Sequence, residues 1–196
     1  MKKVLFLTTL LLLCFTVTTH AQISKEDRAA RREALRKERA EREALEAQQD
    51  SVAYLKAIEA IKAGSFVLEA DFVGFPSGLT RYVSSSTNYI EVNENNGVLQ
   101  TAFSNFSANP GPNGLGGVTV KGSIGTPKFT EDKDGNLYYS FNIQGIAVSA
   151  TIFITVTAGT NQASATITPN FNNNNMTMTG HLVPYDESIV IQGTTW

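Results

Sequence analysis

The sequence predicts a mainly β protein: an antiparallel up-and-down β-barrel, with a β-sandwich as the alternative, preceded by a long charged α-helix. Residues 24–63 contain neither proline nor glycine and are rich in Ala, Glu, Arg and Leu, the strongest helix formers. Residues 66–196 instead hold nine or ten short segments with alternating apolar and polar side chains, separated by turn residues. No second helical stretch interrupts them, a pattern typical of barrels and sandwiches.

The first 21 residues have the parts of a secretory signal peptide. Lys2 and Lys3 give a positive start, an apolar core follows, and small residues precede a cleavage point between Ala21 and Gln22. The apolar run of about 14 residues is shorter than the ~20 that a membrane-spanning helix needs. We therefore expect a periplasmic or secreted protein without a membrane span in the mature chain. An uncleaved anchor is the alternative.

Cys14 supports a second interpretation, in which the mature chain is anchored by a lipid. Residues 11–14 resemble the motif before a lipidated cysteine, although Leu13 stands where that motif has a small residue. Cleavage after Ala21 would instead remove the only cysteine and leave His181 as the one histidine. Disulfides and thiol chemistry are then excluded, and we expect neither a metal nor a cofactor.

Charge is concentrated in the expected helix. Residues 22–65 hold 10 basic and 9 acidic side chains, whereas residues 66–196 hold 4 basic and 9 acidic ones. A nucleic-acid interface needs a clustered basic face. The sequence therefore predicts no nucleic-acid partner.

The helix is expected to have two parts. In residues 22–50 opposite charges recur four residues apart, which stabilises a helix that faces solvent on all sides; we interpret this part as a spacer. In residues 51–65 apolar side chains recur at helical spacing, so this part is expected to dock on the β domain, with Asp50 and Ser51 as its separate cap. Gly64 suits the position that ends a helix.

The β domain is expected to span residues 66–196. Hairpin turns are expected at Asn95-Asn96-Gly97 and at Asp134-Gly135. The expected strands are residues 66–72, 79–84, 88–93, 98–103, 118–124, 137–144, 147–157, 163–168, 176–183 and 188–192. Residues 136–185 contain no Asp, Glu, Lys or Arg. They predict an ordinary uncharged β surface or, alternatively, a patch for a partner, a glycan or a lipid.

Two loops resemble binding motifs without matching them. The glycine-rich residues 111–117 lead into a strand and lack the Gly-Lys-Ser/Thr that ends a phosphate-binding loop; we expect a turn that requires glycine. Residues 131–136 offer carboxylates to calcium, but their glycine comes too early for a calcium loop. A plain hairpin is expected, with calcium as the alternative.

Catalytic candidates are few. His181 has Asp186 and Glu187 five and six residues on, and no serine lies in a nucleophile-elbow motif. A second set of acidic residues, Glu69, Asp71 and Glu91, falls on the polar positions of early strands, where a solvated face explains them. We expect no enzyme, although a hydrolase based on these carboxylates stays open. Trp196 is typical of outer-membrane barrels, but most of the strands are shorter than such barrels need.

Several segments together resemble a family known only as domain of unknown function 4251. They are the signal peptide, the charged helix, residues 66–71, the loop 111–118 and residues 168–172. The resemblance covers roughly residues 50–196. It implies a small secreted or periplasmic protein of Gram-negative bacteria with a lipocalin-like β-barrel, and it implies no activity.

The first expected function is a non-enzymatic envelope protein that binds a small apolar ligand in its barrel, with Phe and Tyr side chains between residues 66 and 171 as candidates to line the pocket. The second is a structural or interaction module bound to an envelope protein. An apolar cavity would favour the first, and a solid core beneath an exposed apolar patch the second.

Overall fold

The computed structural model describes residues 25–103, 111–146, 148–170 and 175–194. The described residues divide into two compact units, one that ends at Leu45 and one that begins at Glu46. The segments predicted for signal cleavage at Ala21 and Gln22 and for lipid attachment at Cys14 lie outside the described residues, as does Trp196.

One continuous helix, α2 (Lys25–Ala63), accounts for the helical stretch. Opposite charges four residues apart pair on its exposed surface, as in Lys37–Glu33 at 3.4 Å. The Ser51 hydroxyl donates to the Ala47 carbonyl one turn earlier, so Ser51 lies inside the helix. The expected separate cap at Asp50 and Ser51 is therefore wrong. Gly64 ends the helix with a φ of 65°, and its N–H bonds to the Ile61 carbonyl.

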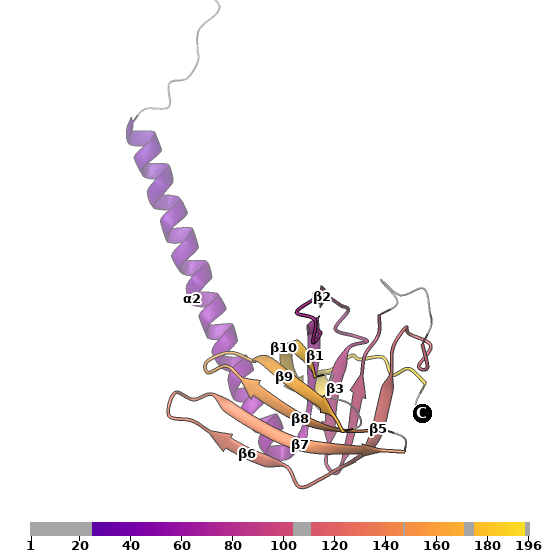
Figure 1. Cartoon of the computed structure of the whole chain (residues 1–196). Helices are drawn as coiled ribbons and strands as arrows, with labels where there is room; N and C mark the ends of the chain where they lie inside the picture. Colours follow the sequence, from indigo (N-terminus) through magenta and orange to yellow (C-terminus); the bar gives the residue numbers. More distant parts are fainter. Residues whose placement is uncertain (1–24, 104–110, 147, 171–174, 195–196) are drawn as a thin grey trace, which may run out of the picture. The chain divides into compact units, whose positions relative to one another are not determined.

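Ten antiparallel strands follow within the described part of the chain (Figure 1). They are β1 (Ser65–Gly74), β2 (Thr80–Tyr82), β3 (Tyr89–Asn93), β4 (Asn96–Gln100), β5 (Thr119–Ile124), β6 (Lys128–Glu131), β7 (Leu137–Gly145), β8 (Ser149–Val156), β9 (Gln162–Pro169) and β10 (Met176–Pro184). The path runs β10-β9-β8-β7-β5-β4-β3-β1, and β1 pairs with β10. That pairing closes an eight-stranded barrel, with β2 and β6 as additional strands. The predicted barrel is confirmed, and the sandwich alternative is wrong.

The seam between β1 and β10 contains a β-bulge. Ala70 pairs with Gly180 and Phe72 with Thr179, so Asp71 is the extra residue. A bulge bends its strand and turns the local carbonyls. The Glu69 carbonyl points at Gly180: a Cβ added to Gly180 would lie 1.9 Å from the Glu69 carbonyl oxygen. Only glycine lets the two backbones approach this closely.

Two local predictions are corrected. The first hairpin turns at Glu94 and Asn95 instead of Asn95-Asn96-Gly97, because Asn93 pairs with Asn96 and Glu94 takes a φ of 55°. Gly97 lies in β4, where an added Cβ would meet the Ile124 side chain at 2.8 Å. Residues 188–192 form no strand. The predicted turn at Gly135 is confirmed, with a φ of 85°.

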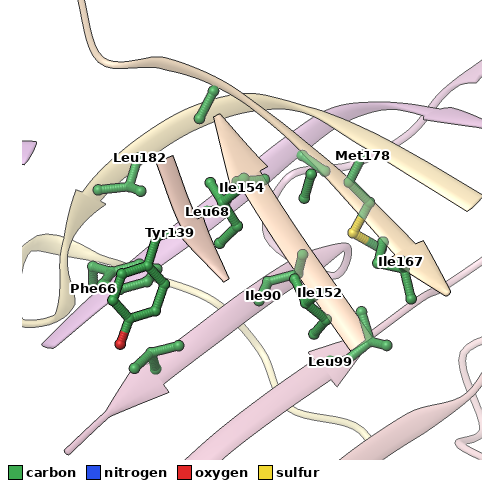
Figure 2. Packing of buried hydrophobic residues seen from close by; sticks show 14 of the residues in the cluster. Phe66, Leu68, Ile90, Leu99, Tyr139, Ile152, Ile154, Ile167, Met178 and Leu182 are labelled. Carbon is green, nitrogen blue, oxygen red and sulfur yellow. The ribbon is translucent and has the colours of Figure 1, made fainter. Parts of the chain in front are cut away.

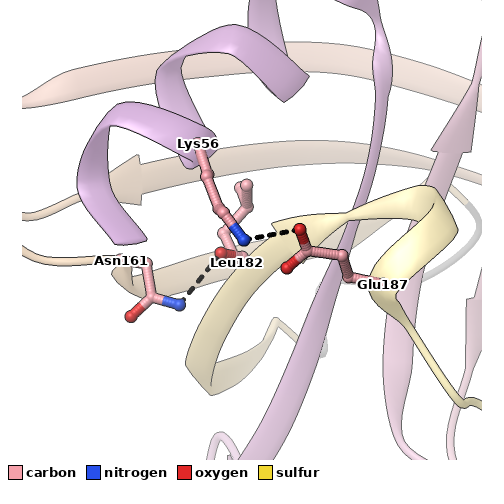
Figure 3. A network of polar contacts seen from close by, with 4 residues as sticks. All are labelled: Lys56, Asn161, Leu182 and Glu187. Carbon is pink, nitrogen blue, oxygen red and sulfur yellow. Dashed lines mark hydrogen bonds and ion pairs between the residues drawn. The ribbon is translucent and has the colours of Figure 1, made fainter. Parts of the chain in front are cut away.

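The end of α2 covers the barrel end at which β1 begins. Ala57, Ala60 and Ile61 are buried in the same apolar cluster as the barrel interior. The Tyr54 hydroxyl donates to the Gly135 carbonyl of the β6–β7 hairpin. The Lys56 ammonium lies 2.6 Å from the Glu187 carboxylate in the short helix η1 (Tyr185–Glu187), which follows β10 (Figure 3).

Candidate functional site

The glycine-rich loop is a structural element centred on a buried side chain. Its Gly111, Gly114 and Gly116 have φ values of 61°, 75° and 82°, which agrees with the predicted glycine-dependent turn. The Asn113 amide nitrogen donates to the Thr101 carbonyl at 2.8 Å, and its oxygen accepts from two backbone N–H groups of the loop. Asn113 therefore replaces the hydrogen bonds that a regular strand would have supplied.

Replacing Asn113 with alanine is expected to lower the free energy of unfolding by about 3 kcal/mol, because several backbone groups that it bonds would be left buried and unpaired. Urea denaturation measures this loss. The matched control is Asn142→Ala, where the lost side chain is exposed and accepts one hydrogen bond from Thr151. Equal losses in the two variants would contradict the role given to Asn113.

The Asp132 carboxylate is occupied by its own hairpin. One oxygen accepts from the N–H groups of Asp134 and Asn136, and the other from the Asn136 amide and the Tyr138 hydroxyl. These hydrogen bonds, led by that of the Asn136 side chain, lower the pKa of Asp132. The geometry is that of the predicted plain hairpin, in which protein donors take the lone pairs that calcium would need.

His181 lies on the outer surface and pairs with a different acid from those near it in sequence. Its Nδ1 is 3.2 Å from Asp71 Oδ2. Glu187 pairs with Lys56, and Glu69 accepts a 2.6 Å hydrogen bond from the Ser188 hydroxyl. Three of the sequence candidates for catalysis therefore meet at the β1–β10 seam on the outside of the barrel: Asp71 contacts His181, and Glu69 is the register partner of His181. No group of three or more His, Cys, Asp or Glu side chains suited to a metal occurs within the described parts of the chain.

A cavity of about 210 Å³, open to solvent on one side, lies in the other end of the barrel, away from the last turns of α2. Five strands and their adjoining turns build its wall. The lining residues are Leu99, Thr101, Val118, Val120, Val148, Ala150, Ile167, Pro169 and Met176.

Different side chains occupy the two ends of the barrel interior. Near α2, Phe66 and Tyr139 meet edge to face with their ring centres 5.2 Å apart, and they fill the barrel. Figure 2 shows them at one side of the core and Leu99 and Ile167 at the other. At that second end the inward positions include Ala150 and the short side chain of Val120.

The cavity offers almost no polar chemistry. Among the described residues that line it, Thr101 alone has a polar side chain, and the Thr101 hydroxyl already accepts from the Val118 N–H at 3.2 Å. None of these described lining residues can ionise. A lining of this kind suits an uncharged apolar molecule.

No sequence motif marks this cavity. Phe and Tyr are the expected lining residues, yet none of the nine described residues that line it is aromatic. Two of the candidates, Phe106 and Phe171, lie outside the described residues. The sequence holds one signal for the cavity. Ala150 on β8 and Val148 just before it are smaller than Ile152 and Ile154, which follow at alternate positions of β8.

Fold and site together define a closed up-and-down β-barrel with an apolar cavity at one end and a helix over the other. The model of the family described as Domain of unknown function (DUF4251) matches residues 48–182. The chain belongs to this family, so the resemblance inferred from its motifs is confirmed.

A solved structure supports the assignment. The crystal structure of a DUF4251 family protein from Bacteroides eggerthii is 49% identical to this chain, with a TM-score of 0.63. The match covers 72% of this chain and 94% of that one. A search of curated proteins finds no match. Within the described residues, no helix is long and apolar enough to cross a membrane.

Proposed function

We propose that this protein is an exported, non-enzymatic barrel that binds one small, uncharged apolar molecule in the cavity near Ala150. The apolar lining of that cavity carries the proposal. An apolar cavity of roughly 150 Å³ is known to be large enough for benzene, and this one measures about 210 Å³. It is smaller than the ~300 Å³ at which pockets for drug-sized ligands begin. The ligand class is therefore a single small ring or a short hydrocarbon chain.

Export follows from the signal sequence in residues 1–21, with lipid attachment at Cys14 as the alternative. An exported carrier of this kind would hold an apolar compound away from water in the cell envelope. The charged part of α2 before residue 46 would act as a spacer, because its side chains are exposed along its described length.

The ligand site is tested by methyl NMR during a titration with toluene. We expect saturable shifts of the Leu99, Val120 and Ile167 methyl groups. Val148→Trp places a large ring in the cavity from a partly exposed position and should weaken binding at least tenfold. Thr166→Trp puts the same ring on the outside of β9 and should leave binding unchanged. Absence of saturable shifts in the unmodified protein would refute the proposal.

A second candidate, a protein-interaction module, is favoured by the β1–β2 hairpin. Phe72 and Tyr82 meet edge to face there with 42% and 72% of their surfaces exposed, and Leu79 beside them is 46% exposed. Apolar surface of this kind suits a protein partner. A protein-interaction module would remain as the proposed function if the cavity bound no ligand.

A further inference from the structure

A second pocket, separate from the cavity, lies on the outside of the barrel beneath the segment that follows β10. Its volume is about 290 Å³. Its floor comes from Val67 on β1 and from Tyr89 and Glu91 on β3, and its roof from residues 185–192. The roof residues belong to the C-terminal part of the chain, beyond the segment matched by the family model.

Hydrogen bonds hold the roof in place. The Ile191 N–H donates to the Ser86 carbonyl, and the Gln100 amide donates to the Ile191 carbonyl, both at 2.7 Å. The Gly193 N–H donates to the Gln100 oxygen, also at 2.7 Å. Because Gln100 is fully buried, these bonds are shielded from water. The pocket is therefore a fixed feature of the fold.

The Tyr89 hydroxyl is an unused polar group in this pocket. Tyr89 is fully buried, and its hydroxyl has no hydrogen-bond partner among the described residues. Burial raises the pKa of Tyr89, with further contributions from Glu91 and Tyr185. Tyr89 and both of these neighbours line the same pocket. A neutral buried hydroxyl without a partner is unfavourable, so a ligand that bonds to it would be stabilised.

The charges around the pocket are suited to a cation. Glu91 is partly buried at its edge, and burial raises the pKa of this carboxyl, while Lys121 acts in the opposite direction. A second carboxylate, Glu69, is held through Ser188. No basic side chain is among the described residues that line the pocket. Val67 and Val190 contribute apolar surface to the wall of the pocket.

We propose that this pocket binds a small alkylammonium group, with Glu91 and the Tyr89 hydroxyl as acceptors and Val67 and Val190 against the alkyl chain. An ammonium carries three N–H donors and no acceptor, which complements a carboxylate and an unpaired hydroxyl oxygen. The alkyl part would replace water against apolar surface. The same chemistry is offered by a free amine or by a lysine side chain of a peptide.

Isothermal titration of the full chain with butylammonium chloride tests the proposal, with butanol as the uncharged control ligand. We expect saturable binding of butylammonium and none of butanol. Titration with Nα-acetyl-lysine amide separates the two sources: tighter binding than butylammonium identifies a peptide lysine, and weaker binding a free amine. No saturable binding of either ammonium would overturn the proposal.

Two variants and a control locate the site. Glu91→Gln should weaken butylammonium binding at least tenfold, whereas Glu131→Gln, the same charge change at an exposed position of β6, should not alter it. Tyr89→Phe should weaken binding and also raise the melting temperature of the free protein, because it removes an unpaired buried hydroxyl. A lower melting temperature in Tyr89→Phe would show that a buried water holds the hydroxyl, and would overturn the proposal.

Discussion

Replacing Gly180 with alanine is expected to cost at least about 4 kcal/mol of folding free energy, among the largest effects of a single substitution. The new Cβ would lie 1.9 Å from the Glu69 carbonyl oxygen and 2.9 Å from the Ala70 Cα. Both contacts are with backbone, so no side-chain rotation relieves them. Relief requires that β1 and β10 separate at the bulge, which is the pairing that closes the barrel.

Denaturant unfolding followed by circular dichroism measures the effect. Gly159→Ala is the matched control: Gly159 has a φ of 75°, but nothing lies within 4 Å of an added Cβ. Its cost should be the ~1–2 kcal/mol of a left-handed residue with a side chain. If Gly180→Ala loses no more stability than this control, the tight seam between β1 and β10 is contradicted.

Introducing a charge at Ile61 is expected to have an effect of similar size. Ile61 is 2% exposed and packs in the barrel cluster from the last turns of α2. Ile61→Asp removes a buried apolar side chain, which costs ~2–5 kcal/mol for truncation alone, and places an unpaired carboxylate in the core. We expect the barrel end covered by α2 to open or the domain to unfold.

Leu55→Asp provides the control, because Leu55 is on the same helix and 59% exposed. The same change there should alter stability by no more than about 0.5 kcal/mol. Hydrogen exchange of β1 and β7 amides reports the result. Unchanged protection in Ile61→Asp would show that α2 does not contribute to the core.

The fold was largely predictable because its signals are local. The helix stop at Gly64 and the turn at Gly135 each follow from a few neighbouring residues. Closure of the barrel is harder to predict from the sequence, since the pairing of Phe66 with Pro184 joins segments that are far apart in the chain. The turn at Glu94 was misplaced because Gly97 suggested a turn, whereas it is needed for close packing against Ile124.

The candidate sites were less predictable. The cavity depends on which inward side chains of different strands face one another, and no sequence spacing encodes that Leu99 and Ile167 share a wall. The pocket at Tyr89 depends on where residues 185–192 lie after β10. Those residues were expected to form a strand, and their position became apparent only through their bonds to Gln100.

Native mass spectrometry of the full chain, purified from the cells that produce it, tests the proposed ligand site most directly. The proposal predicts one small, uncharged apolar molecule per chain in the unmodified protein, and its loss from Val148→Trp but not from Thr166→Trp. If the unmodified protein shows the mass of the bare chain alone, a ligand site in the cavity near Ala150 is contradicted. A bound molecule that Val148→Trp retains equally would contradict it as well.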